Sequence, residues 1–229
     1  MSSTTSTLQV VRGASAGGAW EMVAGEPDGT LRAAVRQRYG FAETGTAHPP
    51  RNEVASAAVV LLVSWGAPYR IAGSADPGRM TDHPLGFVAG LSESYAVSQA
   101  TGDARCVQVM LTPLGARRLL GGLPMGELSN RAIGLDALFG TEAERLAARL
   151  HDAGTWEARL GIVDGFLADR LARAAWGRVR ARTGAGRAAE LVPGNGHVRV
   201  PVAMSAALLL VYLPNVLGKA PVGHRLATG

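Results

Sequence analysis

Histidine, cysteine and carboxylate side chains are the residues of this 229-residue chain whose chemistry could serve catalysis or metal binding. The five histidines are scattered along the chain, at His48, His83, His151, His197 and His224. None of them has the HxH, HxxxH or HExxH spacing that places two ligands on one face, so the spacing predicts no metal and no other cofactor. Asp76, Asp82 and His83 share a loop and could form a polar cluster, although turn chemistry explains their presence better.

Cys106 is the only cysteine, which excludes an intramolecular disulfide and a thiolate zinc site. Its position in the alternating segment Arg105–Val109 predicts a strand residue rather than a nucleophile. No Gly-x-Ser-x-Gly, Walker or dinucleotide-binding fingerprint occurs with the strand and helix that it requires. We therefore predict that the chain has no catalytic residues and is not an enzyme.

Arginine carries almost all of the positive charge, because Lys219 is the only lysine and the net charge is +5. A basic DNA-binding protein and an ordinary arginine-rich protein both fit this balance. The segment from Arg170 to Ala189 has no acidic side chain, and its arginines could contact phosphates or be solvated charges of a linker. Arg117 and Arg118 could likewise bind an anion, support an interface or face solvent. The arginines of the segment from Arg170 to Ala189 are Arg170, Arg173, Arg178, Arg180, Arg182 and Arg187.

The stretch from Val54 to Pro113 is predicted to be mostly β-structure. Short runs at intervals of 8 to 12 residues are typical of a small barrel or sandwich. Trp65 and Tyr95, within two of these runs, could line a ligand pocket or simply fill the core. Residues 31–39 could be a helical turn or an extended entry, and residues 74–84 form a turn-rich loop. The predicted strands cover residues 57–65, 69–72, 87–90, 95–98 and 105–111.

Helical periodicity takes over after Pro113. A short Arg-rich helix closed by Gly121-Gly122 is expected next, followed by a second one near Pro124. Thr141 and Glu144 fit a capping box at the start of a helix that ends near Gly154. An amphipathic helix follows, whose apolar stripe is Trp156, Leu160, Val163, Leu167 and Leu171. Gly177 and the glycines after it are expected to break any helix beyond about Ala175.

The predicted fold is therefore α+β, with four regions along the chain. A flexible arm rich in Ser, Thr and Gly covers residues 1–17, and a β-rich region covers residues 18–115. An α-helical segment covers residues 116–175, and a basic linker with a remnant helical tail covers residues 176–229. The start lacks the pattern of a secretory signal, and the apolar run Val200–Leu213 is too short to span a bilayer. These features predict a cytoplasmic protein with no membrane partner.

Two segments resemble the N-terminal sensing domain of AraC-type (AraC/XylS) transcriptional regulators. One is LTPLGARRLLGGLPMGELSN, Leu111–Asn130, and the other is YGFAE, Tyr39–Glu43. The resemblance implies a cupin-like barrel that binds a small effector, then a helical connector, then two helix-turn-helix units that bind DNA. It also implies that the stripe from Trp156 to Leu171 contributes to dimerisation.

Residues 205–221 resemble the family's helix that begins SxRxL and closes with GxxP. Where that pattern has arginine, this chain has Ala206, Ala207, Val211 and Pro214, so the helix-turn-helix end is expected to be truncated or degenerate. The remaining candidates for DNA contact are Arg178, Arg180, Arg182, Arg187, Arg199, Ser205, Asn215, Lys219 and Arg225.

Three functions follow from these observations. The first is a DNA-binding transcriptional regulator with double-stranded DNA, a small effector and a second subunit, identical or related, as partners. The second is a ligand-binding or dimerisation module that has lost DNA binding and modulates an intact relative. The third is a small-molecule enzyme on a cupin-like barrel, which predicts a bound metal and is disfavoured by the histidine spacing.

Overall fold

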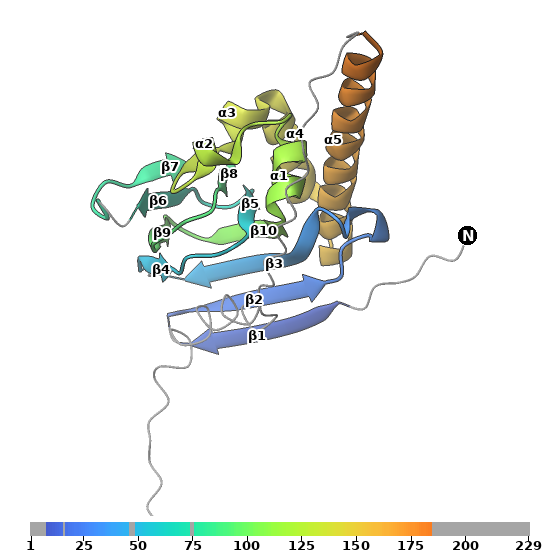
Figure 1. Ribbon diagram of the computed structural model, residues 1–229. Helices are drawn as coiled ribbons and strands as arrows, with labels where there is room; N and C mark the ends of the chain where they lie inside the picture. The colour runs from blue at the N-terminus through green and yellow to red at the C-terminus, as the bar shows by residue number, and fades with distance from the viewer. Residues whose placement is uncertain (1–7, 16, 46–48, 74–75, 185–229) are drawn as a thin grey trace, which may run out of the picture. The chain divides into compact units, whose positions relative to one another are not determined.

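The structure is a computed structural model, and it describes residues 8–15, 17–45, 49–73 and 76–184. Within these ranges the chain has an α+β fold, in which antiparallel strands precede most of the helices (Figure 1). This agrees with the predicted fold class. The elements are β1 (Gln9–Ser15), β2 (Gly18–Gly25), η1 (Gly29–Leu31), β3 (Val35–Gly45), β4 (Arg51–Glu53), β5 (Val59–Ser64), β6 (Tyr69–Gly73), β7 (Thr81–His83), β8 (Gly86–Ala89), β9 (Ala96–Ala100), β10 (Ala104–Leu111), α1 (Pro113–Leu119), α2 (Met125–Leu128), β11 (Ala132–Gly134), α3 (Leu135–Phe139), α4 (Thr141–Asp152) and α5 (Trp156–Gly184).

The described strands form two antiparallel sheets. The larger has seven strands in the order β1-β2-β3-β10-β5-β8-β11, and the smaller has four in the order β4-β9-β6-β7. All five predicted strands are confirmed, as β5, β6, β8, β9 and β10, with ends that differ by no more than a few residues. The extended alternative for residues 31–39 is correct from Val35 onward, where β3 begins.

The prediction of a flexible arm over residues 1–17 is wrong for residues 9–15. Residues 9–15 form β1, which pairs along its whole length with β2, from Gln9 opposite Ala24 to Ser15 opposite Gly18. The Ser- and Gly-rich composition did not indicate this strand, because the strand is held by backbone hydrogen bonds to β2, and the side-chain pattern gives no information about these bonds. The loop over residues 74–84 likewise contains β7, a strand of only three residues.

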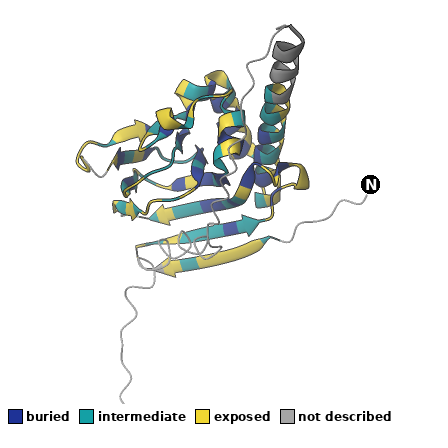
Figure 2. Cartoon of the chain, viewed as in Figure 1, coloured by how far each residue is buried: buried dark blue, intermediate teal, exposed yellow. Residues whose placement is uncertain are grey.

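One face of the seven-stranded sheet packs against the helices. Successive strand residues point to opposite sides, and here the helix-facing set is apolar. Val107, Val109 and Leu111 of β10 belong to the same buried cluster as Leu128, Leu150 and Leu167 from the helices. Figure 2 shows buried residues concentrated where strands and helices meet. The expected boundary at residue 115 therefore lies inside one continuous core.

The join after β10 is confirmed. Thr112 caps α1, since its Oγ1 accepts a hydrogen bond from the Gly115 amide at 3.0 Å. Gly121 and Gly122 close the helix with φ angles of 69° and 95°, a region that favours glycine. The second short helix, α2, begins directly after Pro124 as predicted.

The capping box predicted at Thr141 is not formed. The residue before α4 is Gly140, with φ of 53°, and no side chain caps the helix. Thr141 already lies inside the helix, where its carbonyl and Oγ1 accept hydrogen bonds from Arg145. The sequence pattern was therefore misplaced by one residue, and α4 ends at Asp152, slightly before the predicted Gly154.

The helix-breaking prediction beyond Ala175 is also wrong, because α5 continues to Gly184. An interior glycine costs only about 1 kcal/mol relative to alanine, and the neighbouring Ala and Arg residues are strong helix formers. The predicted linker and remnant tail after residue 184 lie outside the described residues. None of the helices in the described part of the chain has the length and apolarity that a membrane crossing requires.

Candidate functional site

Polar side chains gather between the two sheets. Residues directly opposite each other in an antiparallel pair point to the same side, so the register defines this face. Arg51 lies opposite Ser98 across β4 and β9, and Glu53 follows two residues after Arg51. Glu43 of β3 contacts Arg51, which shows that this side of the small sheet faces the large one. We call Glu43, Arg51, Glu53 and Ser98 the inter-sheet cluster.

The first contact of the cluster is an ion pair between the sheets. Arg51 Nη2 donates to Glu43 Oε1 at 2.7 Å and to Oε2 at 2.9 Å. The two side chains are 16% and 17% exposed, so the pair is shielded but still open to water.

The second contact lies within the small sheet. The Ser98 hydroxyl donates to Glu53 Oε1 at 2.5 Å. Burial raises the pKa of Glu53, and the hydrogen bond from Ser98 and the charge of Arg51 only partly oppose this shift. Glu53 is therefore easier to protonate than an ordinary glutamate, and it can serve as a hydrogen-bond donor or as an acceptor.

Cys106 and Tyr69 make a further contact between the sheets. The Tyr69 hydroxyl lies 3.5 Å from Cys106 Sγ, and both residues are buried. Burial raises the pKa of Cys106 to about 12, so the thiol stays protonated at neutral pH. The prediction of Cys106 as a strand residue is confirmed, since it pairs with Phe41 and Ser64 in β10.

The loop residues Asp76, Asp82 and His83 do not form one cluster. Asp82 and His83 are neighbours on β7, so they point to opposite sides. Asp82 pairs with Arg70 at 2.8 Å on the exposed side. His83 lies opposite Tyr69, is buried and packs on Phe87 at 5.5 Å. Burial lowers the pKa of His83, against the opposing charges of Asp136 and Asp82.

Trp65 and Tyr95, the predicted pocket residues, lie in different surroundings. Trp65 packs edge-on against Trp156 at 6.0 Å, and the Arg159 guanidinium lies 5.3 Å from its ring. This places Trp65 on the helix-facing side of the sheet. Tyr95 precedes β9 and is 42% exposed. The structure therefore does not bring the two residues into one pocket.

Gly40 explains part of the YGFAE segment. A Cβ atom at this position would lie 2.4 Å from the Trp156 ring, so only glycine leaves room for the indole on β3. The Trp156 Nε1 donates to Glu21, which also pairs with Arg12. Burial raises the pKa of Glu21, but these hydrogen bonds outweigh it and leave the pKa below its ordinary value.

The predicted dimer stripe faces the core of its own chain. Leu160, Val163 and Leu167 are at most 1% exposed, and Trp156 and Leu171 pack partly buried against the same cluster. The stripe therefore cannot also be an exposed dimer surface. The amphipathic pattern was correct, but the partner of its apolar face is the sheet of the same chain.

The predicted DNA contacts lie at the end of the described chain or beyond it. Arg178, Arg180 and Arg182 belong to the α5 backbone, which places them on a continuous helix rather than on a linker. Arg187, Arg199, Ser205, Asn215, Lys219 and Arg225 lie outside the described residues.

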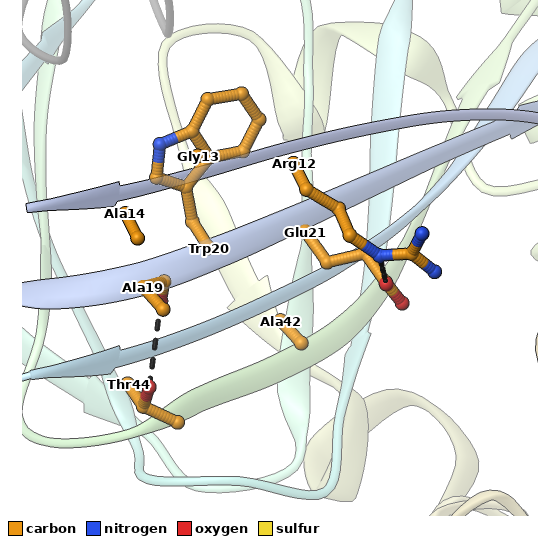
Figure 3. A pocket seen from close by; sticks show the side chains of 8 residues that line it. All are labelled: Arg12, Gly13, Ala14, Ala19, Trp20, Glu21, Ala42 and Thr44. Carbon is orange, nitrogen blue, oxygen red and sulfur yellow. Dashed lines mark hydrogen bonds and ion pairs between the residues drawn. The ribbon is translucent and has the colours of Figure 1, made fainter.

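A shallow hollow of about 590 Å³ lies on the outer strands, beside β1, β2 and β3. Figure 3 shows the Trp20 indole over Gly13, and the Arg12 and Glu21 side chains paired with each other. Most of the lining residues are small, and the two charged ones already satisfy each other. The hollow therefore offers few groups for recognising a ligand.

Sequence reasoning missed the inter-sheet cluster. Arg51 and Glu53 stand two apart in a segment of three strand residues, which is too short to show a period. Glu43 was noticed only as part of the YGFAE segment. The alternation of charge in Arg51-Asn52-Glu53 was the available signal. In the described part of the chain, no three His, Cys, Asp or Glu side chains are arranged to hold a metal ion.

No protein-family model matches the chain, and no curated protein sequence matches it. Solved structures match over part of its length. An HTH_3 family transcriptional regulator from Vibrio cholerae is 8% identical over 41% of this chain, with a TM-score of 0.31. The match covers 51% of that regulator, so this chain spans about half of its length.

Two further matches are named as oxalate decarboxylases. A predicted one from Thermotoga maritima is 11% identical over 48% of this chain and 96% of its own, with a TM-score of 0.33. Another is 14% identical over 64% of this chain and 40% of its own, with a TM-score of 0.30. TM-scores of this size carry no argument about the activity of this chain.

These names nevertheless correct one prediction. The prediction that the chain is not an enzyme is not upheld: proteins named as oxalate decarboxylases are among the matched structures, although these distant matches do not show that the chain is one. Whether this chain catalyses a reaction is unresolved. The matches include a helix-turn-helix regulator, but the AraC type, the effector and the dimer stay predictions.

Proposed function

We propose that the chain is a regulator of the AraC type whose cupin-like sheets bind a small polar effector at the inter-sheet cluster. One observation carries the proposal: β3 contacts both the cluster and α5. Its Glu43 pairs with Arg51 of the cluster, and its Arg38 pairs with Asp164 of α5 at 2.7 Å. A ligand that shifts β3 at the cluster would therefore also shift the contact of β3 with α5, the helix that continues into the basic end of the chain.

The chemistry of the cluster suits a small polar molecule. Two carboxylates, one guanidinium and one hydroxyl lie within one shielded region and pair with one another, so a polar ligand would have to replace these contacts with its own donors and acceptors. Protonation of Glu53 adds a further donor. The side chains come from both sheets, so a ligand that contacts Glu43 and Glu53 together would bridge them. A bridging ligand would bias the position of β3 and, through Arg38, that of α5.

In this proposal, each of the predicted regions has its own role. Residues 18–115 supply the sensing sheets, residues 116–175 supply the helical connector, and residues 176–229 supply the contact with double-stranded DNA. A dimer, in this proposal, uses surfaces other than the buried stripe on α5. The arginines at positions 178, 180 and 182 are the part of the DNA contact that α5 carries.

Salt-dependent binding of the full chain to a mixed pool of duplex DNA tests this proposal. Each phosphate contact that releases a counterion adds about 0.9 to the slope of log affinity against log salt. We expect the triple variant Arg178→Ala, Arg180→Ala and Arg182→Ala to lose about 2 to 3 of this slope. The charge-matched control is a second triple variant, which removes three exposed arginines elsewhere: Arg32→Ala, Arg36→Ala and Arg149→Ala. We expect this control to keep the slope. Equal slopes for the two triple variants would contradict the assignment.

The sensing half is tested separately. A screen of small polar molecules by thermal shift should give compounds that stabilise the full chain. The Arg51→Gln variant should abolish that stabilisation, whereas the exposed control Arg70→Gln should keep it. A compound that alters DNA affinity in the unsubstituted chain and not in Arg51→Gln would join the two halves. Stabilisation that survives Arg51→Gln would place the effector elsewhere.

A module that has lost DNA binding is the second candidate. The substitutions Ala206, Ala207, Val211 and Pro214, at positions where the resembling helix has arginine, favour it. Such a chain would pair with an intact relative and reduce its activity. Cross-linking of the mixed chains tests this idea, and failure to form a heterodimer would remove it.

A further inference from the structure

A basic hollow lies at the junction of α1 and α5. It has a volume of about 680 Å³, within the range of about 300–1,000 Å³ that is typical of small-molecule sites. Arg117 and Arg118 line it from the last turn of α1, and Arg170 and Arg173 line it from α5. None of the nine described residues that line the hollow is acidic.

The arginines from α5 are held in place by the protein itself. Arg170 and Arg173 both pair with Glu142, the latter at 3.2 Å. The Arg170 guanidinium also lies 4.2 Å from the centre of the Phe139 ring, and its Nε donates to the Leu119 carbonyl at 3.4 Å. These contacts hold the Arg170 guanidinium at one wall of the hollow, so little ordering of this side chain is left for a ligand to impose. Arg173 is 61% exposed and is held less firmly, through its contact with Glu142.

The arginines from α1 are not used in this way. Arg117 is exposed, and neither Arg117 nor Arg118 has an ion-pair partner among the residues that the structure describes. Arg118 Nε is buried with no hydrogen-bond acceptor in the described structure, an unfavourable situation for a charged donor. Two of the four guanidinium groups thus pair with Glu142, whereas the other two, of Arg117 and Arg118, have no ion-pair partner among the described residues.

The rest of the lining leaves room beside these charges. Gly121 and Gly122 have no side chains, and open space lies where their Cβ atoms would be. Their amides already bond the Arg118 and Arg117 carbonyls, so the end of α1 presents few free carbonyls to oppose an anion. Leu114, Leu119 and Ala174 add apolar surface. The combination fits an anion with several negative charges and an organic part.

We propose that this hollow binds a small organic anion that carries phosphate or carboxylate groups, with Arg117 and Arg118 as its principal contacts. Guanidinium groups recognise both anions with paired hydrogen bonds, so the chemistry is shared. The site is separate from the inter-sheet cluster and does not depend on the function proposed above. Its concave form favours a small ligand over the backbone of duplex DNA.

Calorimetric titration of the full chain with inorganic pyrophosphate and, in a second arm, with citrate tests the proposal. Ionic strength is held constant with sodium chloride, because screening alone changes the affinity of charged sites. We expect saturable binding of at least one of the two anions. Arg117→Ala should weaken it about tenfold, and Arg117→Ala with Arg118→Ala should abolish it, since each charge-assisted hydrogen bond contributes strongly.

Arg149→Ala is the matched control, since it also removes an exposed arginine from the last turn of a helix. It should leave the affinity unchanged. Arg117 is exposed and alanine favours helices, so the unliganded Arg117→Ala chain should melt at the same temperature as the unsubstituted one. Three outcomes overturn the proposal. Neither anion binds saturably, Arg149→Ala weakens anion binding as much as Arg117→Ala does, or Arg117→Ala weakens the binding of duplex DNA but not that of either anion.

Discussion

The two faces of β3 perform different tasks within eleven residues. On one face, Arg38 and Gly40 contact α5, through Asp164 and Trp156 respectively. On the other face, Phe41 and Glu43 point toward the small sheet, where Glu43 pairs with Arg51. Alternation along the strand places one set of residues against the helices and the next set against polar groups.

The difference lies in how closely each set is held. Arg38 is 6% exposed and Gly40 leaves no space for a methyl group, so the helix-facing contacts are close-packed. The inter-sheet contacts are hydrogen bonds and an ion pair that is somewhat more exposed, at 16% and 17% against 7% and 15% for Arg38 and Asp164, so we expect them to contribute less to stability. This contrast predicts that substitutions on the helix-facing side change stability more, whereas those between the sheets change ligand binding more.

The largest effect is expected for Arg38→Met. Arg38 pairs with Asp164 and donates to the Glu26 carbonyl at 2.7 Å, with side-chain exposures of 7% and 15% for the ion pair. Removing one partner leaves a largely buried carboxylate, whose pKa burial already raises against the charge of Arg38. We expect a loss of about 3 kcal/mol in the free energy of unfolding, measured by urea denaturation at neutral pH.

The double variant Arg38→Met with Asp164→Leu is the control for this loss. It removes both charges, so it should recover at least half of the stability that Arg38→Met loses. An equally unstable double variant would show that packing around Arg38, rather than the unpaired charge, causes the loss.

The second prediction concerns Gly40→Ala. The new methyl group would lie 2.4 Å from the Trp156 ring, so the indole or the strand must shift. Overpacking of this kind costs about 1–3 kcal/mol. Gly165→Ala in α5 is the matched change, because open space surrounds its Cβ position and alanine favours helices by about 1 kcal/mol. Thermal melts of both variants should shift in opposite directions, and a shift of the same sign would contradict the steric argument.

The strands with strong patterns were predictable from the sequence, and the others were not. The apolar run that became β5 and the alternation that became β10 each carry their own signal. β1 takes its place from pairing with β2, and β4, β7 and β11 have only three residues each. Tertiary pairing decides such segments, and a local window does not contain that information. The continuation of α5 past Gly177 has a local cause instead, since one interior glycine costs only about 1 kcal/mol among strong helix formers.

The site was harder to predict than the fold. Glu43 and Arg51 are eight residues apart, and Glu53 and Ser98 are 45 apart, yet each pair is in hydrogen-bond contact. The register of β4 against β9 brings the second pair together. Trp65 and Tyr95 were predicted from their residue type, but Trp65 packs against α5 on the large sheet, whereas Tyr95 is exposed directly before β9 of the small sheet. Residue type alone therefore indicated too little about which side chains share a face.

The third prediction tests the ion pair between the sheets. Arg51→Gln should cost about 1 kcal/mol or less, because the pair is partly exposed and screened by water. Glu43→Gln with Arg51→Gln should cost less than the sum of the single changes, as expected for residues in contact. A double-mutant cycle by chemical denaturation measures this coupling. A loss as large as that of Arg38→Met would remove the contrast between the two faces of β3.

The smallest effect is expected for Glu53→Gln, and its sign depends on pH. Because burial raises the folded-state pKa of Glu53, the stabilising contribution of its protonated form is present below the ordinary value of 4.5. That contribution is lost as pH rises through the raised pKa. Glutamine keeps a neutral group at all pH values, so the variant should gain stability relative to the unsubstituted chain between pH 4 and pH 7.

Thermal melts of the two chains across this range measure the difference, and exposed Glu93→Gln is the control, for which we expect a flat difference. The Glu53 result also distinguishes a binding role of this residue from a structural role between the sheets. If Glu53→Gln raises the melting temperature at pH 7 and also removes ligand-induced stabilisation, the ionised carboxylate is maintained at a cost in stability, as expected for a binding group. A fall in melting temperature at pH 7 would instead assign Glu53 a structural role between the sheets.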